Sequence, residues 1–210
     1  MKQKILLVLL VGVPFLSCFS QSTGKVSGEM TASAIKFLQT LSETQKAKAQ
    51  FTFDNEERYN WKYIPIARKG IPLKELNAVQ HQAGLDLLHT ALSDSGFNKA
   101  TSLMQLETIL KEIENRGADD DHRDPEKYFI SIFGNPAGYS IWAWRFEGHH
   151  VAFNFSSKKN RLISATPGFL GSNPAIVLSG PEKGKQILKD ESELGFALLH
   201  SLDTKQMERA

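Results

Sequence analysis

The segment Trp142–Phe155 (WAWRFEGHHVAFNF) holds the residues whose types and spacing could do chemistry together. Apolar and polar residues alternate around its centre, which is typical of two half-buried strands joined by a tight turn. A two-residue turn at Gly148-His149, with glycine first, pairs Glu147 with His150. In this register one face is aromatic, and the opposite face carries four polar side chains, Arg145, Glu147, His150 and Asn154. The sequence therefore predicts a cation, an acid, a base and an amide within cross-strand contact distance.

These residue types predict catalysis or binding on a rigid sheet face. As catalytic residues, Glu147 and His150 could share a proton or hold a divalent metal ion, with His149 as a further ligand if the turn is wider. Arg145 could hold an anionic group of a small-molecule substrate, and Asn154 could orient that substrate. The alternative is an exported, non-catalytic ligand-binding or structural module, in which the same face is a recognition surface or the contact with a second copy of the unit. A further interpretation is a solvated sheet face on which Arg145 and Glu147 form an ordinary surface ion pair. The residues alone leave these interpretations open.

A second set of candidate substrate-binding residues lies in Phe51–Gly70, which is rich in aromatic residues and lacks a helical period. We expect an extended arm, because Pro65 keeps the residue before it out of helical geometry. Trp61, Tyr63 and Arg68 are the arm residues that could contact a substrate. The alternative is a structural arm whose aromatic rings close over a sheet.

The N-terminal segment predicts export. A short basic start (MKQK) precedes an apolar run, Ile5–Leu16, that is too short to span a bilayer comfortably. We expect a signal peptide over residues 1–20, cleavage after Ser20, and a periplasmic or extracellular protein. The alternative is a lipid anchor on Cys18, although Phe15 fits a lipidation motif poorly.

Composition argues against several classes of partner. Residues 1–20 contain two lysines and no other charge, so their removal lowers the formal net charge from +2 to 0. A neutral chain without a basic cluster argues against nucleic acid, and no second apolar run is long enough for a membrane span. Cys18 is the single cysteine, so the expected mature chain forms no disulfide. The sequence also lacks the G-x-S-x-G, H-E-x-x-H and P-loop motifs.

The spacing of apolar residues predicts an α+β fold. Helical spacing marks four segments, Met30–Leu41, Leu73–Leu92, Asn98–Arg116 and Gly184–Leu202. Before the last of them the period changes to that of strands, in Tyr128–Phe133, Tyr139–Phe146, Val151–Phe155 and Arg161–Ala165. We expect residues 21–210 to form one domain, an antiparallel β-meander with one aromatic face covered by helices.

Two segments far apart in the chain are similar to each other. Phe37–Ala49 (FLQTLSETQKAKA) and Leu198–Ala210 (LLHSLDTKQMERA) align without gaps. Each has Ser or Asp followed three residues later by Gln, the pattern of a helix capping box. A true repeat predicts a second copy of the unit as partner, in a tandem pair or a homodimer. The alternative is two helix corners that resemble each other by chance.

Four segments together also point to a family. They are, in chain order, FDNEERYNWKYIPIARKGIPL (Phe53–Leu73), RDPEKYFISIFGNP (Arg123–Pro136), WAWRFEGHHVAFNF (Trp142–Phe155) and SATPGFLGSNPA (Ser164–Ala175). With them the chain resembles an uncharacterised family catalogued as domain of unknown function 3500. Exported or bacterial membership is common in this family, and the resemblance brings no established activity. Longer relatives continue past the position of Ala210, so the resemblance implies a shortened member of the family.

Overall fold

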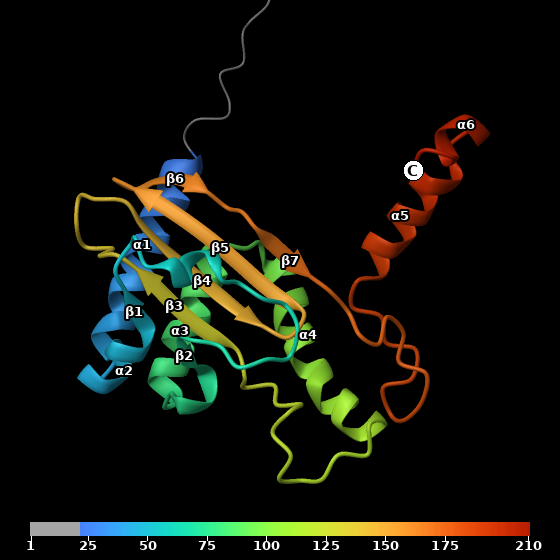
Figure 1. Ribbon diagram of the computed structural model, residues 1–210, viewed down its shortest axis with the longest axis horizontal. Helices are drawn as coiled ribbons and strands as arrows, with labels where there is room; N and C mark the ends of the chain where they lie inside the picture. Colours follow the sequence, from blue (N-terminus) through green and yellow to red (C-terminus); the bar gives the residue numbers. More distant parts are fainter. Residues whose placement is uncertain (1–21) are drawn as a thin grey trace, which may run out of the picture.

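The computed structural model describes residues 22–210, which form an α+β fold (Figure 1). Its α-helices are α1 (Ser22–Thr40), α2 (Glu43–Ala49), α3 (Ala78–Thr90), α4 (Asp94–Ile113), α5 (Lys189–His200) and α6 (Thr204–Met207). Its strands are β1 (Gln50–Phe51), β2 (Ile71–Pro72), β3 (Phe129–Phe133), β4 (Trp142–Gly148), β5 (Val151–Lys158), β6 (Arg161–Ser164) and β7 (Gly168–Leu170). The predicted signal peptide and Cys18 lie outside the described residues.

All of these strands belong to one mixed, mostly antiparallel sheet. β3, β4, β5 and β6 follow one another as an antiparallel meander, which confirms the predicted fold class. In addition, β1 runs parallel to β3, β2 pairs with β3, and β7 pairs with β5. These added strands are only two or three residues long. Such short strands carry too little alternation to be recognised in a sequence.

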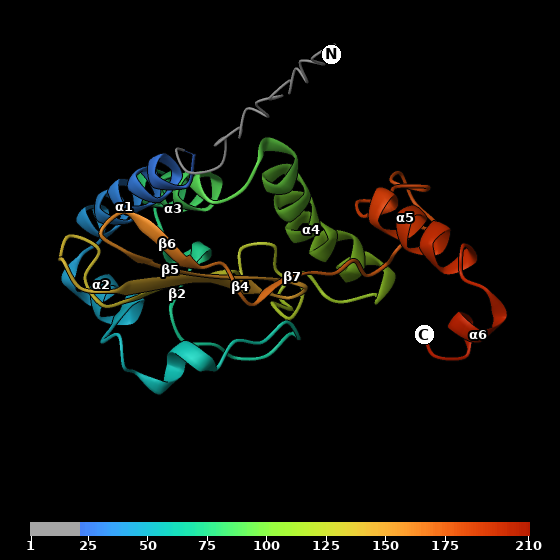
Figure 2. The same cartoon turned by 90° about the horizontal axis from the view of Figure 1, so that it is seen from above.

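Helices α1, α3 and α4 cover the aromatic face of the sheet (Figure 2), as predicted. The core between the two layers includes Phe37, Leu87, Leu103, Ile130, Trp144, Phe146 and Phe155. Helix α1 contributes a stripe of buried residues at three- and four-residue spacing, Met30, Ala34 and Phe37, followed by Leu41. This spacing places them on one side of the helix, so that α1 lies flat against α3 and the sheet.

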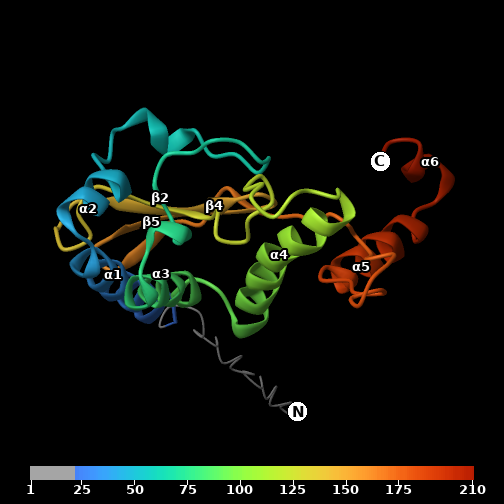
Figure 3. The ribbon, with the colours of Figure 1, turned by 90° about the horizontal axis from the view of Figure 1, so that it is seen from below.

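The segment between β1 and β2 covers the opposite face of the sheet (Figure 3). Residues 52–70, hereafter the arm, contain one short 3₁₀ helix, η1 (Glu56–Tyr59), and are otherwise extended or turning. The centre of the sheet is therefore buried on both faces, Trp144 and Phe146 on one and Arg145 and Glu147 on the other. The alternative of an exposed ion pair between Arg145 and Glu147 is wrong, because the arm covers both side chains.

Helices α5 and α6 project from this layered body (Figures 1 and 2). Helix α5 begins at Lys189, five residues later than predicted, because Gly184 has a φ of +91° and turns the chain. The predicted start of α3 at Leu73 is early, because Leu73–Glu75 form a separate 3₁₀ helix, η2. The helix begins after Asn77, whose side chain accepts hydrogen bonds from the backbone N–H groups of Val79 and Gln80.

No helix within residues 22–210 is long and apolar enough to cross a membrane.

Candidate functional site at the hairpin turn

The turn between β4 and β5 consists of His149 and His150, one residue later than predicted. Gly148 pairs with Val151, so the predicted register is wrong by one residue on each strand. Because the shift occurs on both strands, strand residues keep the faces that the sequence predicts. His150, however, leaves the sheet and becomes a turn residue with a φ of +62°.

Position 148 needs a glycine because Tyr128 leaves no space for a side chain there, and not because the turn needs a positive φ. A Cβ atom at this position would lie 2.2 Å from Cδ1 of Tyr128, because the tyrosine ring lies directly on the glycine backbone. The left-handed conformation that usually identifies a turn glycine is adopted here by His150. The glycine therefore marks a close approach between β4 and Tyr128, and this explains why the sequence predicted the wrong turn.

Arg145 and Glu147, predicted as catalytic residues, lie in a closed ion network beneath the arm. We call the set Glu57, Arg68, Arg145 and Glu147 the arm network. Arg145 Nε lies 2.7 Å from Glu147 Oε1, and Arg145 Nη2 lies 2.8 Å from Glu57 Oε1. The side chains of Arg145 and Glu147 are 0% and 1% exposed. Burial raises the pKa of Glu147, although the nearby Arg145 and Arg68 favour its carboxylate form.

Arg68, predicted to bind substrate, holds the arm to the hairpin. Its Nε lies 3.7 Å from Glu147 Oε2, and its Nη2 donates to the carbonyl oxygen of Gly148 at 3.0 Å. The guanidinium also donates to the carbonyls of Lys62, Ile64 and Ile66. Arg68 thus binds carbonyl groups of the arm and of β4, and it fixes the path of the arm.

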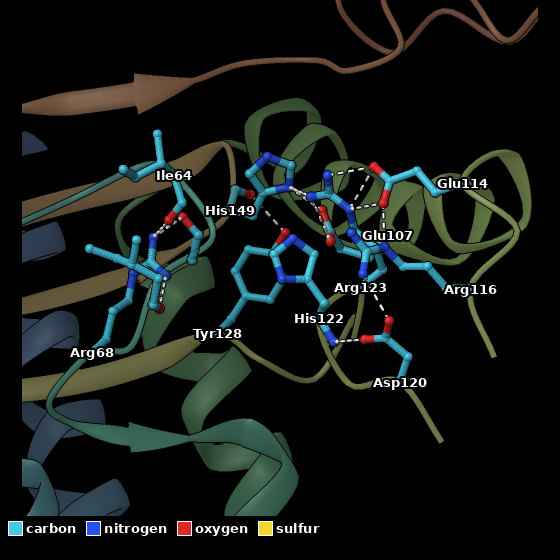
Figure 4. A network of polar contacts seen from close by, with 12 residues as sticks. Ile64, Arg68, Glu107, Glu114, Arg116, Asp120, His122, Arg123, Tyr128 and His149 are labelled. Atoms are coloured by element: carbon cyan, nitrogen blue, oxygen red, sulfur yellow. Dashed lines mark hydrogen bonds and ion pairs between the residues drawn. The ribbon is translucent and has the colours of Figure 1, made fainter. Parts of the chain in front are cut away.

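His149 belongs to a second buried network, with Glu107 of α4 and Arg123 of the loop before β3 (Figure 4). We call these three residues the pocket network. Nδ1 of His149 contacts Oε1 of Glu107 and lies 3.2 Å from Nη1 of Arg123. Arg123 Nη1 also lies 3.7 Å from Glu107 Oε2, so the carboxylate lies between a cation and an imidazole.

The chemistry of the Glu107 contact assigns the proton on the His149 ring. An ionised carboxylate only accepts hydrogen bonds, so Nδ1 of His149 must donate to it. In the neutral ring Nε2 then carries the free lone pair, and Figure 4 shows this nitrogen pointing away from Glu107 and Arg123. Arg123 acts mainly as a charge beside Glu107, since two donors cannot bond to each other. A histidine oriented by a carboxylate, with its second nitrogen free, is the usual arrangement of a general base.

Glu107 and His149 of the pocket network form part of the wall of a pocket of about 360 Å³. The arm, α4, the loop before β3 and the hairpin turn all contribute to its lining. Its polar lining residues include Arg68, Glu107, His122, Lys127, Tyr128 and His149. A pocket of this size with several convergent polar groups is suited to a small molecule.

Neighbouring side chains hold the pocket network in place. The Tyr128 hydroxyl donates to the carbonyl oxygen of His149 at 2.8 Å, and burial raises the pKa of Tyr128, which keeps the hydroxyl protonated. Arg123 Nη2 donates to Glu114 Oε1 at 2.6 Å. Hydrogen bonds from Arg123 and Arg116 lower the pKa of Glu114 to about 2, so it remains a carboxylate. The charges that orient Glu107 and His149 are therefore fixed from outside the pocket.

His150, predicted as the base, is not among the residues that line this pocket. Its N–H donates to the Tyr63 carbonyl and its carbonyl accepts from the Gly171 N–H, both at 2.8 Å. Its ring lies against that of His149, with 4.0 Å between ring centroids. Burial lowers the pKa of His150 to about 4, so its ring is neutral over most of the physiological range. The adjacent His149 has the geometry that we expected of His150.

The remaining predicted binding residues lie outside the pocket lining. Asn154 donates through Nδ2 to the carbonyl of Pro167 at 3.0 Å. The ring of Tyr63 packs between Phe169, at 4.5 Å, and Trp61, at 6.2 Å between centroids. The structure thus places these side chains in contacts that hold the arm and the strand β7 region together.

The structure does not bring all three predicted metal ligands together, because Glu147 lies apart from His149 and His150. Glu147 lies in the arm network with Arg145, whereas His149 contacts Glu107 in the pocket network. In the part of the chain that the structure describes, no group of three or more His, Cys, Asp or Glu side chains is placed to hold a metal ion.

Glu107 and Arg123 are candidate site residues that sequence analysis missed, although the sequence holds a signal for Glu107. Glu107 lies on the buried side of α4 together with Leu103, Leu106 and Leu110. A charged residue on such a stripe needs a buried partner, which makes it a candidate for a site. Its partners, His149 and Arg123, come from distant parts of the chain, and no local pattern connects them.

Comparison with known proteins gives a family and no further relative. No curated protein and no solved structure matches the chain. The family described as "Protein of unknown function (DUF3500)" has a model that matches residues 23–210, nearly all of the residues described here. The chain therefore belongs to the DUF3500 family.

Proposed function

We propose that this chain is an exported protein that binds a small polar molecule in the pocket lined by Glu107 and His149. His149 exchanges a proton with the bound molecule. Glu107 orients the imidazole, and Nη1 of Arg123 lies 3.7 Å from Oε2 of Glu107. The observation that carries the proposal is the contact between Nδ1 of His149 and the Glu107 carboxylate in the wall of a pocket of about 360 Å³. A purely structural histidine at a hairpin turn needs neither the buried carboxylate nor the adjoining cavity.

Two further parts of the proposal rest on the sequence. The basic start and the apolar run of residues 5–16 support export, and the amino-terminal sequence of the secreted protein tests it. The sequence also predicts that the protein binds a divalent metal ion, and this prediction needs a direct measurement. Metal analysis of the purified protein beside a His149→Gln variant tests it, and an ion lost in the variant supports metal-assisted chemistry.

The protonation of His149 gives a test that requires no knowledge of the substrate. We expect nitrogen NMR to find His149 with the proton on Nδ1 and a free Nε2, and the His149→Gln variant assigns the signal. A proton on Nε2 with Nδ1 accepting from Arg123 contradicts the role of His149 as base, because the free lone pair would then face the protein.

The non-catalytic alternative differs in its response to the same variant. We expect that extracts of small polar metabolites contain a compound that the protein consumes, and that His149→Gln abolishes its consumption. His89→Gln is the matched control, since His89 pairs with Asp94 on the surface at 2.8 Å. A compound that the wild type binds without change, with equal affinity for His149→Gln, indicates a binding module in which His149 has no chemical role.

A further inference from the structure

The charged side chains that line the pocket of about 360 Å³ balance one another. They are Arg68, Glu107, Asp124 and Lys127, two cations and two anions. A pocket that selects an ion needs an excess of the opposite charge, because the ion loses its hydration when it enters. The balance therefore argues against an ion as the molecule that binds here.

The two most buried of these charges are also paired by residues outside the lining. Nε of Arg68 lies 3.7 Å from Oε2 of Glu147. Nη1 of Arg123 lies 3.7 Å from Oε2 of Glu107. Glu147 and Arg123 are not among the residues that line the pocket. The charges of Arg68 and Glu107 are thus compensated within the protein, and they require no ligand of opposite charge.

The other two charges are paired in the same way, by Lys74 and Asp121. Nζ of Lys127 lies 2.8 Å from Oδ2 of Asp121. Nζ of Lys74 lies 3.5 Å from Oδ2 of Asp124 and 3.1 Å from Oδ2 of Asp121. Hydrogen bonds from Lys127 and Lys74 lower the pKa of Asp121 to about 2, so it remains a carboxylate. Lys74 and Asp121 also lie outside the lining.

Hydrogen-bonding groups beside an apolar surface remain available to a ligand. Nε2 of His149 has a free lone pair, and Oε2 of Glu107 is too far from Arg123 to accept a hydrogen bond from it. The ammonium group of Lys127 has three N–H donors and needs only one for Asp121. The apolar part of the lining consists of Pro65, Ile66, Ala67 and Phe129.

We propose that the molecule bound in this pocket is a neutral polyhydroxylated compound of the size of a monosaccharide. The inference rests on the proposed function, because it names the substrate class of the same pocket. Hydroxyl groups donate to His149 and Glu107 and accept from Lys127 without bringing a charge into the pocket. The C–H face of the compound packs against the apolar lining. The volume lies near the lower end of the range of about 300–1,000 Å³ for ligand pockets, which suits a single sugar ring.

Two variants test the location and the charge argument. Ala67→Trp fills the pocket without removing a polar group and should abolish the binding of a neutral sugar. Ala175→Trp is its matched control, because Ala175 is exposed and lies outside the lining. In Asp121→Asn, Lys127 loses its partner although no lining residue changes. We expect a sugar acid to bind this variant about three- to fivefold more tightly than the wild type. Asp119→Asn removes a charge from the same loop and should have no such effect. Equal responses within either pair of variants overturn the proposal.

Calorimetry on the wild-type protein with matched sugars is the decisive experiment. Each set contains a neutral aldose, its uronic acid and its amino sugar, so that the members share one ring and differ in charge. At about pH 8, where free imidazole is neutral, we expect a neutral member to bind at least about tenfold more tightly than its charged partners. If no neutral member binds, or if a charged partner binds as tightly, the proposal is overturned.

Turnover of the same compounds separates this inference from the proposed function. A neutral sugar that binds without being consumed retains the substrate class and contradicts proton transfer by His149. Consumption of an ionic compound, lost in His149→Gln, contradicts the substrate class alone.

Discussion

The arm network and the pocket network both place buried carboxylates beside arginines, but only the pocket network also contains a histidine. Both are anchored on β4 or the turn that follows it. The arm network is closed by residues 52–70, and its arginines satisfy carboxylates and backbone carbonyls. His149 and Glu107 of the pocket network line a cavity, which Arg68 of the arm network also reaches. The comparison indicates that buried charges become a candidate site where a side chain that can transfer a proton also lines a cavity.

The largest effect that we expect is the loss of stability when the arm network loses one of its arginines. Replacement of Arg145 by Met leaves the buried carboxylates of Glu147 and Glu57 without their cation. We expect a loss of about 3–5 kcal/mol in the free energy of unfolding, measured with urea. Lys48→Met, which removes a surface ion pair with Glu75, is the control and should cost less than about 1 kcal/mol. Equal losses would remove the distinction between a closed network and an ordinary ion pair.

Gly148 connects the two networks, and its substitution should affect both. Its carbonyl binds Arg68 of the arm network, while its Cα lies under the ring of Tyr128, which holds His149. In Gly148→Ala the added methyl collides with that ring, and we expect a loss of about 1–3 kcal/mol. Gly28→Ala is a suitable control, because a Cβ at Gly28 meets nothing within 4 Å. A Gly148→Ala protein as stable as the control contradicts the close packing of Tyr128.

Glu107→Gln should have a smaller effect on stability than Arg145→Met and a larger effect on chemistry. The amide oxygen still accepts from His149, and Arg123 keeps its ion pair with Glu114 at 2.6 Å. We expect a loss of about 1–2 kcal/mol in the free energy of unfolding. Consumption of the substrate should nevertheless fall, because the amide no longer stabilises a protonated imidazole. Unchanged consumption in a folded variant contradicts the role of Glu107.

The smallest effect that we expect is on the pH dependence of stability, and it comes from His150 of the turn. Since the pKa of His150 falls from 6.5 to about 4 on folding, the unfolded chain binds more protons between these values. Stability should therefore decrease as the pH falls from 6.5 towards 4. His150→Asn retains a residue that tolerates the positive φ and should remove about 1 kcal/mol of this dependence, because solvent screens a half-buried ring. Unfolding curves at both ends of this pH range measure it, and an unchanged slope contradicts the assignment.

Much of the fold could be predicted because its helices and strands carry strong periodic patterns. Trp142, Trp144 and Phe146 alternate with Arg145 and Glu147, and this fixed the two faces of β4 even when the register was wrong. The capping box at Ser42 likewise predicted the start of α2. Local propensity and periodicity agree in these elements, so the sequence is sufficient to identify them.

The candidate site could be predicted only in part, because its assembly depends on long-range contacts. The hairpin drew attention to His149 and His150, but the difference between them depends on Glu107, which lies on α4. The arm was expected to be extended, yet nothing local showed that Arg68 would bind four carbonyls and cover Glu147. Interactions across such distances in the chain leave no periodic signal in either segment.

The hairpin turn has a practical consequence for protein engineering. Turns between strands normally accept inserted peptides, because their backbones are exposed. Here the backbones of His149 and His150 are bound by Tyr128, Tyr63 and Gly171, so an inserted tag would break three attachments at once. The turn at Lys159-Asn160, by contrast, is exposed on both residues. A fluorescent label or an affinity tag therefore belongs between β5 and β6, where it leaves the pocket intact.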